Sequence, residues 1–277
     1  MKKRIHDVCR VLSVTMTAIF IMSGLSAVSA ADMAGSETEI DPLSAIPAPI
    51  ISSGDFGYQN NEDGTITIAE YTGTEQDIII PDEIDGFTVS QIGYQAFTYK
   101  EMNSLVIPST VETIGSRAFE YCKIRDALVL PEDITVSSSA FSYAELPTVV
   151  YIPAGAELKK DAVSYCKNLE ILIIDQNAIA EEAAFSYSKQ LKSVVCAENV
   201  CLKEDSFEYC YSLEQVILCG EVDVDGDAFD NSGSAQISNV GADDFYVVLE
   251  AMQEEITEPK DVTPADGPKY HSWFQHE

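Results

Sequence analysis

One aromatic position recurs through the middle of this chain at a constant spacing of 22 residues. The positions are Phe97, Phe119, Phe141, Val163, Phe185, Phe207 and Phe229, with valine standing once in place of phenylalanine. A fixed period between about 20 and 50 residues is typical of stacked repeats, because one short coil cannot bury its apolar face without neighbours. The spacing therefore predicts a solenoid in which each aromatic side chain occupies the same place in successive coils.

Each repeat also contains a short apolar strand, which ends at proline in the early copies. Residues 105–108, 128–131 and 150–153 show this pattern, and the step from Pro108 to Pro131 is one residue longer than the others. Proline cannot donate a ladder hydrogen bond, so it ends the strand and turns the corner. Because side chains alternate along a strand, two residues of each strand point inward and the one between them points outward.

The outward positions form a candidate binding site. They are apolar or aromatic in six successive copies: Val106, Val129, Tyr151, Ile173, Val195 and Ile217. On a strand ladder they would form an exposed stripe with a polar rim of Glu170, Lys192 and Glu214, and an exposed apolar patch of this kind commonly marks a partner site. The alternative is β-propensity alone, since such residues suit strands wherever they point.

Several copies resemble a known repeat family. Residues 107–108 (IlePro), 111–115 (ValGluThrIleGly), 118–119 (AlaPhe) and Cys122 form one full copy, and residues 91–97 form another. This pattern resembles the BspA-like bacterial leucine-rich repeats, also known from Treponema-type proteins, over about residues 56–240. It departs where Val163 replaces phenylalanine, where the Ile-Gly pair is lost after Gly115 and where proline is lost after Pro153.

The expected fold is an α/β repeat solenoid with coils of about 22 residues. A strand ladder would form one face and short helical or 3-10 turns the other. Residues 53–77 would form an N-terminal capping hairpin, residues 78–240 the solenoid, and residues 241–256 a capping helix that closes the last coil. The resemblance implies a secreted surface protein that adheres to host matrix, to host cells or to other microbes.

The N-terminal and C-terminal segments outside the repeats have features that predict export and flexibility. Lys2, Lys3 and Arg4 precede an apolar run of about 12 residues and a small-residue stretch, so residues 1–30 read as a secretory signal peptide. A membrane anchor is the alternative, but it would need about 20 apolar residues. Residues 31–52 are expected to be a flexible linker and residues 257–277 a disordered tail. We therefore expect an extracellular protein, free or cell-surface associated, without stable membrane insertion.

Charge narrows the range of partners. The chain has 16 Lys and Arg against 46 Asp and Glu, a formal net charge of −30. Nucleic acids and anionic lipid surfaces need Lys or Arg to neutralise their phosphates, so neither is an expected partner. The acidity either keeps the protein soluble or attracts basic partners or divalent cations.

Cysteine spacing argues against the most obvious disulfides. Cys122, Cys166 and Cys210 occupy one repeat slot, but successive members are two coils apart, or about 9.6 Å, which exceeds the roughly 7 Å limit for a bridge. We expect buried thiols at these positions. Pairs of Cys196 with Cys219 or with Cys201 stay open.

No catalytic residue or cofactor is predicted. The three histidines, His6, His271 and His276, lie outside the repeats, which removes the usual Ser-His and Cys-His pairs. No metal site is predicted either. Asp223, Asp225 and Asp227 are two residues apart, so in an extended stretch their carboxylates would lie on one side and could bind calcium. They lack the glycine and glutamate spacing of a calcium loop.

A second ladder contains Tyr99, Tyr121, Tyr143, Tyr165, Tyr187 and Tyr209. We expect these rings to stack with their hydroxyls in water, the alternative being a surface for protein or sugar. The predicted function is noncovalent binding of a protein or glycan through the strand face. Two alternatives remain: a structural or assembly component of the envelope, and a hydrolase with paired carboxylates.

Overall fold

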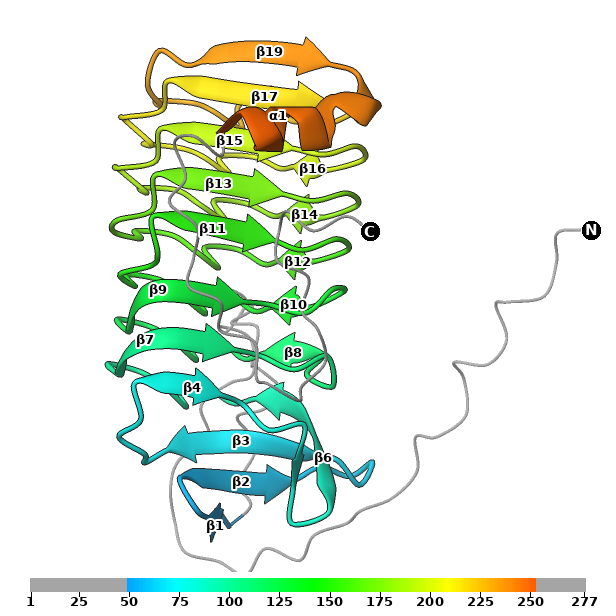
Figure 1. The fold of residues 1–277 in the computed structure, drawn as a ribbon. Helices are drawn as coiled ribbons and strands as arrows, with labels where there is room; N and C mark the ends of the chain where they lie inside the picture. The colour runs from blue at the N-terminus through cyan, green and yellow to red at the C-terminus, as the bar shows by residue number, and fades with distance from the viewer. Residues whose placement is uncertain (1–48, 253–277) are drawn as a thin grey trace, which may run out of the picture. The chain divides into compact units, whose positions relative to one another are not determined.

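The structure is a computed structural model that describes residues 49–252. These residues form a stack of β-coils (Figure 1). The predictions for residues 1–30 and 257–277, and for most of the linker, lie outside the described residues. Ile51 and Ser52, which were expected in that linker, belong to a strand instead.

The first three strands form an antiparallel unit at the N-terminal end of the stack. They are β1 (Ile51–Ser53), β2 (Phe56–Asn60) and β3 (Ile66–Tyr71). β3 then pairs in parallel with β6 (Phe87–Ile92), and β5 (Glu83–Ile84) pairs antiparallel with β6. The hairpin is thereby joined directly to the parallel stack.

The longer strands of successive coils form the strand face, which is divided into two parallel ladders. The first contains β4 (Asp77–Ile79), β7 (Glu101–Val106) and β9 (Lys123–Val129). The second contains β11 (Val149–Ile152), β13 (Ile171–Ile174), β15 (Ser193–Cys196), β17 (Gln215–Cys219) and β19 (Gln236–Val240). Leu172 aligns with Val194 and Val194 with Val216, which is the 22-residue step expected from the sequence.

Short strands continue from β6 as a second sheet. They are β8 (Thr113–Ile114), β10 (Thr135–Val136), β12 (Glu157–Leu158), β14 (Ile179–Ala180), β16 (Cys201–Leu202) and β18 (Asp223–Val224). Each full coil therefore contains one long strand, one short strand and one compact turn.

The strand face is interrupted between β9 and β11. The extra residue before Pro131 is absorbed in β9, where pairing with β7 shifts register between Met102 and Ser104. In the next coil, Pro147 precedes β11 and has no N–H to offer to β9. An apolar cavity of about 10 Å³, lined in part by Phe141 and Val163, lies at this interruption.

The turns are not helical, which corrects the expectation of helical or 3-10 turns. Phe119 N–H donates to Ala140 O of the next coil at 2.8 Å, whereas the following N–H of Glu120 donates back to Arg117 O at 3.1 Å. Amide groups thus alternate between the next coil and the same turn, while a helix would direct all of them along its own axis. Arg117 and Tyr121 have φ values of 57° and 58°, which allow this alternation.

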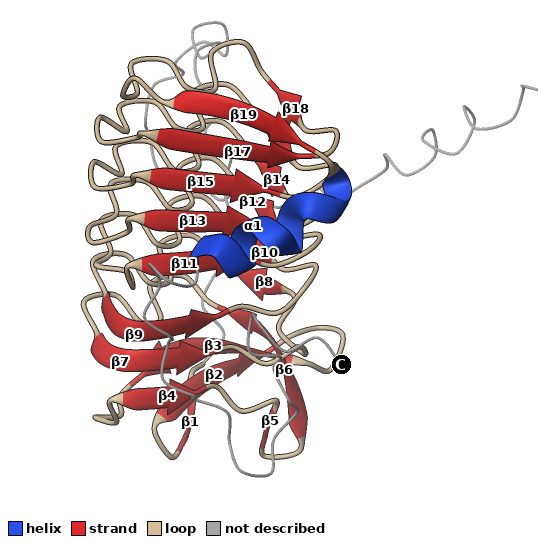
Figure 2. Ribbon diagram, turned by 45° about the horizontal axis from the view of Figure 1, so that its top comes forward, coloured by secondary structure: helices blue, strands red, loops and turns tan. Residues whose placement is uncertain are grey.

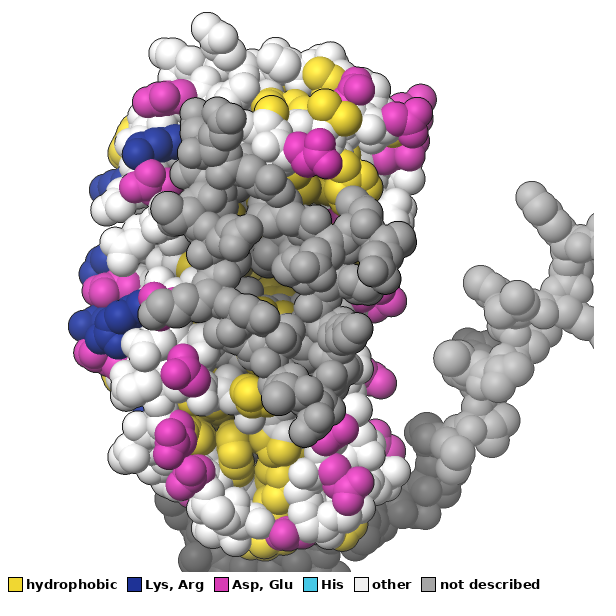
Figure 3. Space-filling view, in the orientation of Figure 1, with side chains coloured by type: hydrophobic (Ala, Val, Ile, Leu, Met, Phe, Trp, Pro, Cys, Tyr) yellow, Lys and Arg dark blue, Asp and Glu magenta, His cyan; other side chains and the backbone are white. Residues whose placement is uncertain are grey.

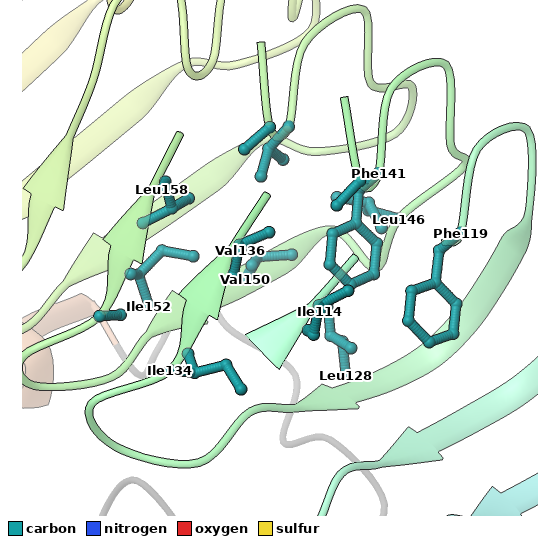
Figure 4. Close-up of a cluster of buried hydrophobic side chains, with 14 of the residues drawn as sticks. Ile114, Phe119, Leu128, Ile134, Val136, Phe141, Leu146, Val150, Ile152 and Leu158 are labelled. Atoms are coloured by element: carbon teal, nitrogen blue, oxygen red, sulfur yellow. The ribbon is translucent and has the colours of Figure 1, made fainter. Parts of the chain in front are cut away.

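The aromatic side chains at the 22-residue positions form the centre of the core, as expected. Phe119 and Phe141 are buried, with ring centroids 4.9 Å apart and planes inclined by 5°. Figure 4 shows them beside Ile114, Leu128 and other apolar residues of neighbouring coils. Cys122, Cys166 and Cys210 are buried free thiols, as predicted.

The C-terminal helix lies elsewhere than expected. After a 3-10 turn (η2, Ala242–Asp244), α1 (Phe245–Met252) runs across the strand face instead of covering the last coil (Figure 2). The predicted residues 253–256 of this helix lie outside the described residues. The last coil, with β19 as its final strand, has no helix over it within residues 49–252.

Candidate binding surface on the strand face

Helix α1 covers the C-terminal half of the predicted stripe. Its buried side chains Phe245, Leu249 and Met252 follow helical spacing on one face, while Val247 on the other face is 61% exposed. They form an apolar cluster with outward residues of β13, β15 and β17, which are Ile173, Val195, Ile217 and Cys219, and with Ala197, which follows β15. The outward row therefore packs against an amphipathic helix.

The prediction that the whole row is exposed is wrong. Ile173, Val195 and Ile217 are buried because α1 lies on them, and Val106 in β7 is also buried. Periodicity had correctly placed these residues on the outer side of the strands, but it contains no information about what packs there. Val129 and Tyr151 are half-buried and are the two predicted stripe residues that keep partial access to solvent.

Tyr151 has a defined hydrogen bond. Its hydroxyl donates to the Asp175 carboxylate in the next coil. Burial, reinforced by this carboxylate, raises the pKa of the Tyr151 hydroxyl, so the residue stays a neutral donor. Tyr151 also packs on the α1 cluster, and it marks the border between the covered and uncovered parts of the strand face.

Sequence reasoning missed one residue of the row. Ile79 in β4 aligns with Val106, and Val106 aligns with Val129, so Ile79 is the first member of the stripe. Its side chain is 48% exposed. The same strand-then-proline pattern at residues 78–81 could have identified it, but the inserted turn before β6 separates this copy from the regular spacing.

Ion pairs between coils line one edge of the strand face. Glu101 contacts Lys123 at 2.9 Å and Arg125 at 2.8 Å, and Lys192 contacts Glu170 at 2.6 Å. Hydrogen bonds from Lys123 and Arg125 lower the pKa of Glu101. Figure 3 shows Lys and Arg side chains along one edge of the molecule, among Asp and Glu. This edge is the polar rim of the stripe.

Asp223, in β18, and Asp225 and Asp227, which follow it, do not form a metal-binding group. Asp223 accepts a hydrogen bond from Cys201 Sγ at 3.2 Å and lies 3.5 Å from Lys203 Nζ. Within residues 49–252 there is no group of three or more His, Cys, Asp and Glu side chains placed to hold a metal ion. Asp223 is therefore engaged with Cys201 and Lys203 of the neighbouring coil.

The tyrosine ladder stacks as expected. Ring centroids from Tyr99 to Tyr209 are 5.1, 4.9, 4.6, 4.3 and 4.6 Å apart in order. All six tyrosines have φ between 57° and 62°, a conformation that bulky residues rarely adopt. Because the faces are stacked on each other, the ladder offers mainly ring edges and hydroxyls to solvent, and Tyr99 at its start is 71% exposed.

The repeats match a known family. Residues 127–236 match six copies of the family described as BspA type leucine rich repeat region. No curated protein sequence matches the chain. No helix within residues 49–252 has the length and apolar character needed to cross a bilayer.

Several solved structures are similar to this chain at low identity. A cell surface protein from Faecalibacterium prausnitzii is 17% identical (TM-score 0.28), with 73% of this chain and 97% of that one covered. The Treponema pallidum leucine-rich repeat protein is 18% identical (TM-score 0.40; 74% and 96% covered). The pneumococcal vaccine antigen PcpA is 19% identical (TM-score 0.40; 71% and 51% covered).

The six matched copies agree with the 22-residue register of the strands. Residues 127–236 of this chain are repeats of the BspA type leucine rich repeat family.

Proposed function

We propose that this protein acts outside the cell and binds a partner protein noncovalently through the strand face. The observation that carries the proposal is the packing of α1 on Ile173, Val195 and Ile217. An apolar stripe that accommodates an amphipathic helix within the chain has the chemistry needed to accept a similar segment from another protein. Export follows from the signal-like features of residues 1–30 and belongs to the same proposal.

The uncovered part of the strand face is the proposed contact. Ile79 is the exposed apolar residue at its start, the half-buried Val129 and Tyr151 lie further along the stripe beyond Val106, and the Glu101, Lys123 and Arg125 ion pairs form its rim. Protein interfaces usually have an apolar core surrounded by a polar rim that is accessible to solvent. The partner segment is therefore expected to be apolar on one side and polar at its borders.

An exposed apolar residue can be charged without opening the core, so Ile79→Glu is the direct test. The full chain would be used to capture partners from host matrix and from microbial surface extracts, with captured proteins identified by mass spectrometry. Ile79→Glu should lose the specific partner with an unchanged melting temperature. Val247→Glu, which charges an exposed valine on the solvent side of α1, is the matched control and should retain it.

Other outcomes would redirect the proposal. Equal capture by Ile79→Glu and by the native chain would remove the strand-face site. Concentration-dependent self-association that Ile79→Glu abolishes would favour the envelope-assembly function, and turnover of glycans or peptides by the purified chain would favour the hydrolase.

A further inference from the structure

The final long strand of the stack has a free edge. β19 pairs with β17 on one side, where Gln236 N–H donates to Glu214 O at 2.8 Å and Gly220 N–H donates to Val240 O at 3.0 Å. Backbone groups alternate in direction along a strand, so those of Ile237 and Asn239 point away from β17. No strand within residues 49–252 pairs with that side of β19.

The apolar core is also open at this end. Ile237 aligns with Val216, which is fully buried, and therefore continues the inward-facing row. It is nevertheless 53% exposed, because the described chain adds no further coil above it. Phe229, the last aromatic residue of the core ladder, is half-buried while Phe207 is fully buried. A free strand edge beside exposed core residues is a ready site for one more strand.

All the charged residues in the last part of the described chain are acidic. Residues 204–252 contain twelve Asp and Glu and no Lys or Arg. In the preceding coils acids and bases alternate: Lys192 pairs with Glu170 in one neighbouring coil, and its pKa is also raised by Glu214 in the other. This alternation stops at Glu214, because Gln236 of the next coil aligns with Gln215 and the residue before it, at the position that would hold the next base, is Ala235.

A second copy of this chain does not match that charge. The same end of another copy would present the same acids. The opposite end is no better, because residues 49–99 contain nine Asp and Glu and no Lys or Arg. Stacking two copies at either end would bring like charges together without compensation.

An open depression adjoins the start of β19. It has a volume of about 610 Å³ and is lined by residues including Tyr211, Glu214 and Gln236. The Glu214 carboxylate is exposed there. The depression has room for a long side chain that ends in a positive charge. The Tyr211 ring beside it already has one cation over it, since Lys189 Nζ lies 5.8 Å from the ring centroid.

We propose that the free edge of β19 binds an extended segment of another protein in which apolar residues alternate with Lys or Arg. The segment forms backbone hydrogen bonds with Ile237 and Asn239, places an apolar side chain over Ile237, and directs a basic side chain toward Glu214. Such strand addition derives affinity from the main chain and specificity from alternate side chains. The site is separate from the strand-face contact proposed above.

The experiment uses the full chain and fluorescein-labelled synthetic peptides, with binding measured by fluorescence anisotropy. The probe alternates valine and lysine, and its control has the same residues with all lysines at one end. Asn239→Pro removes an N–H that points away from β17 and leaves β17–β19 pairing in place, since proline is tolerated where an edge N–H faces solvent. It should weaken probe binding by about tenfold.

Glu214→Lys tests the charge without touching the backbone. It should weaken binding by about tenfold and reduce its salt dependence, whereas Glu250→Lys, an equal charge change on exposed α1, should stay within about twofold. Ile79→Glu should bind the probe normally, which separates this site from the strand face.

Three results would overturn the proposal. The first is equal binding of the alternating and block peptides, which would mean charge attraction without strand pairing. The second is a dimer of the native chain that Asn239→Pro dissociates, which would assign the edge to a second copy. The third is probe binding only after residues 253–277 are removed, which would assign it to the chain's own C-terminal segment.

Discussion

Tyr165 and Tyr187 stack with ring centroids 4.3 Å apart and planes inclined by 6°, and both hold φ near 58°. A left-handed conformation costs a non-glycine residue about 1–2 kcal/mol. The same relationship extends through the other four tyrosines of the ladder. Stacking and hydrogen bonds between coils must together offset that cost, so the ladder couples backbone conformation to ring packing.

Substitutions at Tyr165 can separate these two effects. Tyr165→Ala removes two ring contacts, each contributing about 0.5–1.5 kcal/mol, and keeps the unfavourable φ, so the free energy of unfolding should fall by about 1–3 kcal/mol. Tyr165→Gly loses the same contacts but accepts positive φ, and should be about 1 kcal/mol more stable than the alanine variant. Urea unfolding measures both.

The control for this pair is Tyr94→Ala. Tyr94 is exposed and outside the ladder, so its loss should change stability by less than about 0.5 kcal/mol. If the glycine variant at position 165 proved less stable than the alanine variant, the left-handed conformation would not be a cost at that position.

The core ladder should respond differently at its centre and at its open end. Phe119 lies between two stacked neighbours and is fully buried, so Phe119→Ala should lower the free energy of unfolding by about 3–5 kcal/mol. Phe229→Ala removes a half-buried ring with one stacked neighbour, so it should lower the free energy of unfolding clearly less than Phe119→Ala does. Equal losses in urea unfolding would mean that the last coil is as well covered as the central ones.

Periodicity was sufficient to predict the stacking of the core and the alternation of the strands. The 22-residue step of Phe119 to Phe141 corresponds to one coil, and the predicted slot of Cys122 is buried. Each of these follows from a residue's relation to its own strand and to an equivalent neighbour. Local pattern contains that information, because every copy faces the same environment.

Periodicity could not predict features in which a group has several possible hydrogen-bond or packing partners elsewhere in the fold. A turn with Ala-Phe at its centre can direct its amides to itself or to the next coil, and only the stack determines that Phe119 N–H bonds to Ala140 O. Likewise, the apolar face of α1 predicts burial but not its location on Ile173 and Val195. The exposure of Ile237 depends on where the stack ends within residues 49–252, which no periodicity describes.

The thiols should differ sharply in reactivity. Burial raises the pKa of Cys210 to about 12 and of Cys219 to about 11, and both side chains are shielded. Cys201 is half-buried, so among the six cysteines of residues 49–252 it should be alkylated first in the native protein at pH 8, about tenfold faster than the rest. Mass spectrometry of the labelled peptides measures this order.

Cys201→Ser supplies the control for the labelling experiment. It should leave the other five thiols unlabelled until urea unfolds the chain. Early labelling of Cys122 or Cys166 in the native protein would contradict the burial of these side chains between the coils.

Asp161 should make the chain less stable at neutral pH. Desolvation by burial raises the pKa of its carboxyl, with Lys160 acting in the opposite direction. A raised pKa in the folded state means that the ionised form opposes folding, so the cost is present above the folded pKa and disappears as pH falls below the unfolded value. Asp161→Asn should therefore be modestly more stable at pH 7.

The asparagine variant also suits the backbone, because Asp161 has a φ of 58° and asparagine tolerates that region. Urea midpoints of the two proteins should converge near pH 3, where both side chains are neutral. A stability difference that stayed constant from pH 7 to pH 3 would assign the effect to the hydrogen bonding or packing of asparagine instead of to charge.

The helix on the strand face should detach without unfolding the solenoid. Leu249→Ala removes a buried contact with the α1 cluster at a local cost of about 2–5 kcal/mol, and a helix of eight residues cannot persist in water by itself. Detachment would expose Ile173, Val195 and Ile217, raising the fluorescence of a dye that binds apolar surface and the amide exchange rates of β13 to β17. Val247→Ala, at an exposed position on the same helix, should change neither the dye fluorescence nor the amide exchange rates.

The midpoint of global unfolding of Leu249→Ala should stay close to that of the native chain, because the main core lies on the other side of these strands. Cooperative loss of the whole stack in Leu249→Ala would mean that α1 is an integral part of the fold, and the strand face could not then exchange it for a partner.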